Sequence, residues 1–170
     1  FNLAHYEFRT LKAQQLMQQH ELGALLLTTE TNVRYFTGFL TRFWESPTRP
    51  WYLIIPQSGK PIAVIPSIGE ALMSKTWVED IRTWPSPDLT DDGINLLSET
   101  LNEVAKKNRV GIPSGAETHV RIPRNDLIKL SQNVNLSHDF EIVKNLRMIK
   151  SKEEIIKIEN ACMIAKEAFS

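Results

Sequence analysis

Apolar residues along this chain form two kinds of pattern. Short continuous runs, as at residues 24–28, are typical of strands buried on both faces of a sheet. Apolar residues spaced three or four apart, as Ile94, Leu97 and Leu101 are, predict amphipathic helices. On this basis strands are expected at 24–28, 51–55, 62–65, 80–84, 109–112 and 134–137, and helices at 3–20, 67–75, 90–107, 123–130 and from 151 onward.

Turn-forming residues separate two of these strands. The segment 56–61 reads Pro-Gln-Ser-Gly-Lys-Pro, which predicts a hairpin between strands 51–55 and 62–65. Elsewhere strands alternate with helices, as they do in domains with parallel sheets. We therefore predict an α/β domain with a mixed, mostly parallel sheet and one antiparallel hairpin, flanked by helices. Thr90 is expected to cap the helix that follows it.

The last twenty residues carry the clearest helix-start signal. Ser151 followed by Glu154 has the spacing of a capping box, in which each residue bonds the backbone N–H of the other. No helix-stop signal follows before the chain ends. We therefore expect residues 1–150 to form one domain and residues 151–170 to begin a linker helix towards a further domain.

An apolar stripe runs along this last helix. The stripe consists of Ile155, Ile158, Cys162, Ala165 and Phe169, which recur at helical spacing. Such a stripe needs a partner surface, so we expect either pairing between copies of the chain or docking of the helix back onto its own domain. On the stripe, the thiol of Cys162 is expected to be a small buried core group.

Charge and composition narrow the class of protein. Lys and Arg together number 20, as do Asp and Glu, so the net charge is zero. A neutral chain argues against nucleic acid or an anionic membrane as the main partner. A single cysteine makes no internal disulfide, which fits a reducing compartment and a cytoplasmic location. No apolar run approaches the ~20 residues of a membrane span.

Motifs that carry catalysis or metal binding are not found in the sequence. The histidines His5, His20, His119 and His138 show no paired-ligand spacing. HExxH, CxxC, GxSxG and GxGxxG are all lacking. We therefore assign no catalytic and no metal-binding residue to this chain.

The segment 39–51 is the strongest candidate for a functional surface. It places Phe43, Trp44 and Arg49 in a loop between a turn and an expected strand. Aromatic residues and arginine are the types most favoured at interface hot spots. A binding surface and ordinary core packing both remain open for these side chains at this point.

Two sequence motifs resemble a known family. The first is Thr-Asn-Val-Arg-Tyr-Phe-Thr-Gly-Phe at 31–39, and the second is Leu-Arg-Met-Ile-Lys-Ser-Lys-Glu-Glu-Ile at 146–155. In this order and spacing they resemble the N-terminal domain of the pita-bread metalloenzymes, which include creatinase, aminopeptidase P and prolidase. The resemblance covers essentially all 170 residues. It implies a sheet arrangement similar to ribonuclease H.

The same resemblance implies a function for the parent protein. A C-terminal catalytic domain would follow the last helix and hold two divalent metal ions (Mn, Co or Zn), with none of their ligands in this chain. This domain alone would then be inactive, and the parent would be a homodimeric hydrolase of Xaa-Pro dipeptidase or aminopeptidase type. Phe43 or Trp44, together with Arg49, match the positions that reach the partner subunit's substrate cleft. Arg147 and Lys150 match the inter-domain joint.

Two alternatives stay open within this fold. Some relatives act on a small zwitterion such as creatine, an ectoine derivative or dimethylsulfoniopropionate, and an aromatic–arginine pair would suit such a substrate. A metal-free protein-binding module of the same fold also exists as a histone-chaperone subunit, although zero net charge argues against a histone partner.

Overall fold

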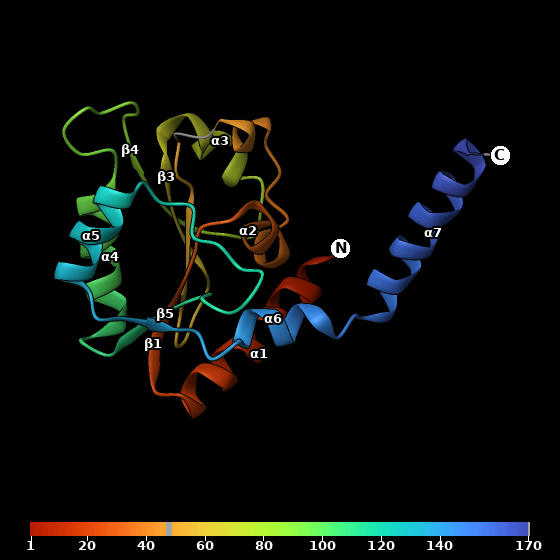
Figure 1. Cartoon of the computed structure of the whole chain (residues 1–170), viewed down its shortest axis with the longest axis horizontal. Helices are drawn as coiled ribbons and strands as arrows, with labels where there is room; N and C mark the ends of the chain where they lie inside the picture. The colour runs from red at the N-terminus through yellow and green to blue at the C-terminus, as the bar shows by residue number, and fades with distance from the viewer. Residues whose placement is uncertain (47–48, 170) are drawn as a thin grey trace.

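The computed structural model describes residues 1–46 and 49–169 and forms a mixed α/β domain with one sheet (Figure 1). The strands are β1 (Leu22–Leu27), β2 (Tyr52–Pro56), β3 (Ile62–Pro66), β4 (Asp80–Trp84), β5 (Arg109–Ile112) and β6 (Leu136–His138). The α-helices are α1 (Leu3–Gln19), α2 (Glu30–Thr37), α3 (Glu70–Met73), α4 (Ile94–Ala105), α5 (Arg124–Asn133), α6 (Ile142–Met148) and α7 (Lys152–Ala168). Two short 3-10 helices are η1 (Arg42–Glu45) and η2 (Ser67–Gly69).

The sheet has the order β4-β3-β2-β1-β5-β6. Strand β2 runs antiparallel to both of its neighbours, β1 and β3, and the other three pairings are parallel. The predicted hairpin is confirmed as β2–β3, with Tyr52 opposite Val64. One reversed strand therefore creates two antiparallel pairs in a mostly parallel sheet, and the predicted fold class is confirmed.

Helices cover both faces of this sheet (Figure 1). Leu25 and Leu27 of β1 join a core cluster with α1, α2 and α6, whereas Ala24 and Leu26 join a second cluster with α4 and α5. Every residue of β1, β2 and β3 is buried. The continuous apolar runs in the sequence arise because successive side chains of these strands enter different cores.

The start of α4 differs from the prediction. The helix begins at Ile94, and the carboxylate of Asp91 accepts hydrogen bonds from the backbone N–H groups of Ile94 and Asn95, both at 3.1 Å. Thr90 therefore does not cap the helix. The residue before Ile94 is Gly93, whose φ of 87° lies in the left-handed region. A methyl group at Gly93 would lie 2.4 Å from the Trp84 ring, so only glycine fits there.

Helix α7 projects away from the rest of the domain (Figure 1). The capping box is confirmed: the Ser151 hydroxyl accepts from the Glu154 N–H at 3.2 Å, and the Glu154 carboxylate accepts from the Ser151 N–H at 2.8 Å. None of the helix residues is buried. Among the described residues, no helix combines the length and the apolar character that crossing a membrane requires.

The apolar stripe of α7 is therefore exposed, contrary to two predictions. Cys162 is exposed rather than buried. Ile155 and Ile158 are 45% and 50% exposed, so the helix does not dock back onto its own domain. Ile156 and Ile164 add apolar surface beside the stripe, so the helix is apolar on more than one side. Pairing between copies of the chain stays a prediction.

Candidate functional site

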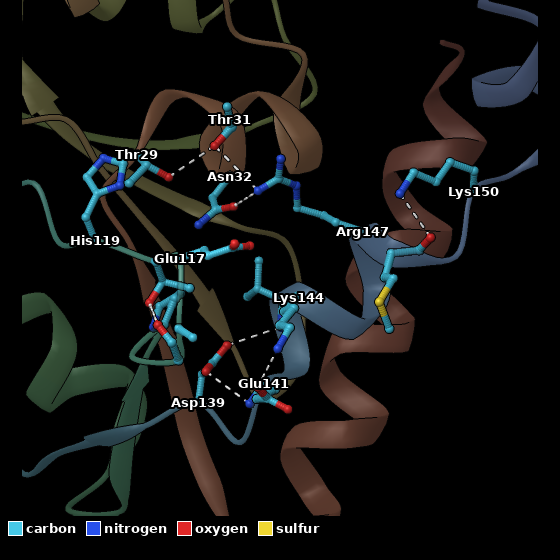
Figure 2. Close-up of a pocket in the computed structure, with 16 residues that line it drawn as sticks. Thr29, Thr31, Asn32, Glu117, His119, Asp139, Glu141, Lys144, Arg147 and Lys150 are labelled. Atoms are coloured by element: carbon cyan, nitrogen blue, oxygen red, sulfur yellow. Dashed lines mark hydrogen bonds and ion pairs between the residues drawn. The ribbon is translucent and has the colours of Figure 1, made fainter. Parts of the chain in front are cut away.

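The two sequence motifs meet in space where the domain body joins α7. The Tyr35 hydroxyl donates a hydrogen bond to the Leu146 carbonyl at 3.1 Å, across 111 positions of sequence. The Arg147 guanidinium donates to the Asn32 side-chain oxygen at 2.8 Å, as Figure 2 shows. We call the region defined by these contacts the joint. The first motif forms α2, and the second forms the end of α6 and the start of α7.

A buried arginine of α1 holds the centre of the joint. Arg9 is only 6% exposed. Its guanidinium donates to the Tyr35 carbonyl at 2.6 Å and to the Glu154 carboxylate at 3.0 Å. It also lies 4.1 Å from the centre of the Tyr35 ring, a cation–π distance. Burial of this ring raises the pKa of the Tyr35 hydroxyl, and the positive charge of Arg9 partly offsets that rise.

Sequence reasoning missed Arg9, although a local signal was present. Arg9 stands at helical spacing from Ala13 and Met17, and both of these are fully buried. A charged residue in a buried stripe needs a partner. That partner, Glu154, lies 145 positions further along the chain.

A second polar contact joins the N-terminal helix α1 to α7, nearer the surface. The His5 imidazole Nε2 lies 3.0 Å from the Glu153 carboxylate. The hydrogen bond from His5 is the main cause that lowers the pKa of Glu153 to about 2. Residues 5 and 9 of α1 thus contact residues 153 and 154 of α7 through two adjacent pairs.

A pocket of about 360 Å³ lies beside the joint, at the C-terminal ends of β1, β5 and β6 (Figure 2). Both predicted joint residues, Arg147 and Lys150, line it, and Glu117 and His119 face it from the loop after β5. The Lys150 ammonium donates to the Met148 carbonyl at 3.0 Å. The inter-domain role of Arg147 and Lys150 stays a prediction; Arg147 bonds Asn32 of α2, and Lys150 lines the same pocket.

Asp139 also lines this pocket, but its carboxylate is bonded to backbone N–H groups. It is buried, and its carboxylate accepts from the N–H groups of Glu141 at 3.1 Å and Val143 at 3.2 Å, which holds the start of α6. Within residues 1–46 and 49–169, no group of three or more His, Cys, Asp or Glu side chains is placed to hold a metal ion.

The candidate loop 39–51 begins directly after α2. Phe43 is 38% exposed and stacks on Trp51 with ring centres 6.1 Å apart. The Arg49 guanidinium lies 6.0 Å from the Phe43 ring centre, so these two predicted residues come together. Residues 47 and 48 of this loop lie outside the described part of the chain.

Trp44, in contrast, is buried. It is 8% exposed and packs 6.0 Å from Trp51, with the Arg121 guanidinium 5.1 Å from its ring centre. It belongs to the core cluster beneath the loop. Of the two aromatic candidates, Phe43 is therefore the one on the surface. Its role at a substrate cleft stays a prediction, as does that of Arg49.

The fold and the joint define a mixed-sheet α/β domain whose last helix is held by polar contacts. The model of the Creatinase/Prolidase N-terminal domain matches residues 9–149 of this chain. The chain therefore belongs to the Creatinase/Prolidase N-terminal domain family, as the two motifs predicted.

Sequence relatives include peptidase-like proteins of bacteria. A protein of Sinorhizobium fredii described as a hydrolase/peptidase is 26% identical over 171 residues, covering 96% of this chain and 43% of that protein. A Staphylococcus aureus protein described as a peptidase is 27% identical over 156 residues, covering 88% of this chain and 39% of its own length. The chain thus spans about two fifths of the length of these relatives.

Solved structures of dipeptidases and prolidases share the fold. A prolidase from Thermococcus sibiricus superposes with a TM-score of 0.78 at 21% identity, covering 96% of this chain and 42% of that one. A dipeptidase from Pyrococcus horikoshii gives a TM-score of 0.74 at 24% identity, covering 95% of this chain and 42% of that one. At these identities the likeness concerns the fold alone.

Proposed function

We propose that this chain is the non-catalytic N-terminal domain of a metal-dependent hydrolase of Xaa-Pro dipeptidase or aminopeptidase type. The observation that carries the proposal is the joint, in which the two family motifs contact each other at the base of an otherwise unpacked helix. Peptidase-like relatives more than twice as long as the matched region support it. Two divalent metal ions, Mn, Co or Zn, would be held by the catalytic domain that α7 leads to.

The domain would have two tasks in the parent protein. At the joint, its contacts fix the position of the catalytic domain relative to this domain. At loop 39–51, it lends Phe43 and Arg49 to the substrate cleft of the partner subunit in a homodimer. Arg49 can hold a substrate carboxylate through two parallel hydrogen bonds, and Phe43 can cover an apolar proline ring.

The relatives, which are described as peptidases, favour a peptide substrate over a small zwitterion, and Arg49 suits the carboxylate that either substrate would carry. Its guanidinium already lies 6.0 Å from the centre of the Phe43 ring. This cation would attract a substrate carboxylate, whereas a substrate ammonium group would compete with it for the same aromatic ring. Both classes of substrate carry both groups, so Arg49 alone does not distinguish them.

Substrate specificity tests this role. In the complete protein, Arg49→Gln should lower kcat/KM for Xaa-Pro dipeptides roughly 10- to 100-fold, the loss expected for a hydrogen bond to a charged group. Xaa-Pro amides, which have no terminal carboxylate, should be cleaved equally by both forms. Arg42→Gln, in the same loop, serves as the matched control. Equal loss on acids and amides would contradict a carboxylate clamp.

A further inference from the structure

We propose that Arg9 is a positioning residue that fixes the direction in which α7 leaves the domain. Through α7 it sets the distance between loop 39–51 and whatever α7 carries. The first statement rests on the contacts of this chain alone. The second rests on the proposed function.

One guanidinium connects the two elements concerned. Nη1 of Arg9 donates to the Tyr35 carbonyl, near the end of α2, from which the chain passes directly into loop 39–51. Nη2 donates to the Glu154 carboxylate, in the first turn of α7. The same side chain therefore holds the base of the loop and the base of the helix.

Aromatic rings restrict the guanidinium to this position. Its central carbon lies 4.1 Å from the centre of the Tyr35 ring and 4.5 Å from that of Phe1. Glu154 is restricted as well, because its second oxygen accepts from the Ser151 N–H in the capping box. Rotation of α7 about its first turn would break at least one charge-assisted hydrogen bond.

Apolar packing does not fix the direction of α7. None of its described residues is buried. Its other contacts with the body include the His5–Glu153 pair, with side chains 22% and 53% exposed, and the Lys157 ammonium, 5.1 Å from the Phe1 ring centre. Contacts that are more open to solvent constrain geometry more weakly. The largely buried Arg9–Glu154 pair, with side chains 6% and 18% exposed, is therefore the strongest of these contacts.

The chemistry of the contact requires arginine. The planar guanidinium supplies two nitrogens with fixed directions, one for each acceptor. Lysine at this position would keep the charge but offers a single nitrogen, so it would hold the helix or the loop base less firmly. Arg9→Lys should therefore restore only part of the order that Arg9→Met removes.

The direction of α7 can be measured in the 170-residue chain itself. Nitroxide labels would be placed on the native Cys162, which is exposed on α7, and on Gln132→Cys, an exposed position of α5. Pulsed electron spin resonance should give a narrow distance distribution for the parent chain. The distribution should broaden and shift in Arg9→Met, and less so in Arg9→Lys.

Two further variants keep this test decisive. Glu154→Gln leaves Arg9 in place and preserves the capping box, so it should broaden the distribution even if Arg9→Met fails to fold. Arg82→Met removes an arginine that bonds two carboxylates, those of Asp80 and Glu103, far from α7 (Figure 1), and should leave the distribution unchanged. A broad distribution in the parent chain, or an unchanged one in both Arg9→Met and Glu154→Gln, would overturn the proposal.

The complete protein tests the second statement. Arg9→Met should raise KM about tenfold while kcat changes by less than about threefold, because the loop is displaced from the cleft but the reacting groups are not. An unchanged KM would overturn the link to the loop. If the complete parent protein shows no turnover, the proposed function fails, but the label distances still decide whether Arg9 positions α7.

Discussion

A double-mutant cycle between Arg9 and Glu154 measures the strength of the joint. Glu154→Gln keeps the acceptor that the capping box needs but removes the charge that faces Arg9. Arg9→Met keeps the length of the side chain and removes the guanidinium. Because each change leaves the other half of the pair in a largely buried place, both single variants should be less stable than the parent chain.

The structure sets the expected magnitudes. Losing one partner of a fully buried pair costs about 3–5 kcal/mol. Glu154 is 18% exposed, so we expect about 2 kcal/mol for Glu154→Gln. Arg9→Met also leaves the Tyr35 carbonyl without its donor, so we expect about 3 kcal/mol. The double variant should lose about 3.5 kcal/mol, which leaves a coupling of about 1.5 kcal/mol.

Urea unfolding at pH 7, followed by tryptophan fluorescence and far-ultraviolet circular dichroism, gives these free energies. Coincident transitions by the two probes would justify the two-state treatment. A coupling below about 0.5 kcal/mol would show that the pair is no stronger than an exposed ion pair. That result would refute the reasoning from burial, and with it the view that this contact dominates the joint.

Other consequences follow from separate contacts. The pKa of Glu153 is lowered to about 2, chiefly by the hydrogen bond from His5, so the ionised carboxylate stabilises the fold above about pH 4.5. This stabilisation is lost as pH falls towards 2. Urea unfolding of Glu153→Gln, repeated across this pH range, should show no such loss. Gly93→Ala should lower the free energy of unfolding by about 3 kcal/mol through backbone strain and contact with Trp84, seen as a lower Tm. Asp91→Ala should cost about 1 kcal/mol, and Thr90→Ala less, in the same thermal assay.

Local patterns were sufficient for most of the fold. The hairpin followed from turn residues between two apolar runs, and the capping box at Ser151 followed from a spacing of three. The start of α4 was misplaced because two acidic residues and Thr90 all suit a helix start. Only the left-handed backbone at Gly93 decides which of them reaches the first free N–H groups.

Local patterns could not predict the contacts between segments that lie far apart in the sequence. The resemblance brought the motifs at 31–39 and 146–155 into one family, but no spacing rule indicates that Tyr35 reaches Leu146 or that Arg9 reaches Glu154. Residue type likewise made Trp44 and Phe43 equally good candidates for a functional surface. Which ring enters the core depends on the turn of η1 and on the position of Trp51 beneath it.

Helix α7 shows a second limit of prediction from the sequence. Its stripe of isoleucines predicted a partner surface, and Cys162 was expected to be buried within it. In this chain the same residues are exposed, because the contacts of α7 with the body, such as those to Arg9, His5 and Phe1, lie near its start and leave the stripe uncovered. Sequence periodicity indicates that a face is apolar, but it does not identify the surface that covers it.

The most direct test of the central claim compares this 170-residue chain with the complete protein. Both would be loaded in turn with Mn²⁺, Co²⁺ or Zn²⁺ and assayed for release of the residue that precedes proline in Xaa-Pro substrates. We predict metal-dependent turnover by the complete protein and none by the 170-residue chain. Turnover by the 170-residue chain itself, or a complete protein that binds no metal ion and cleaves no Xaa-Pro bond, would contradict the account.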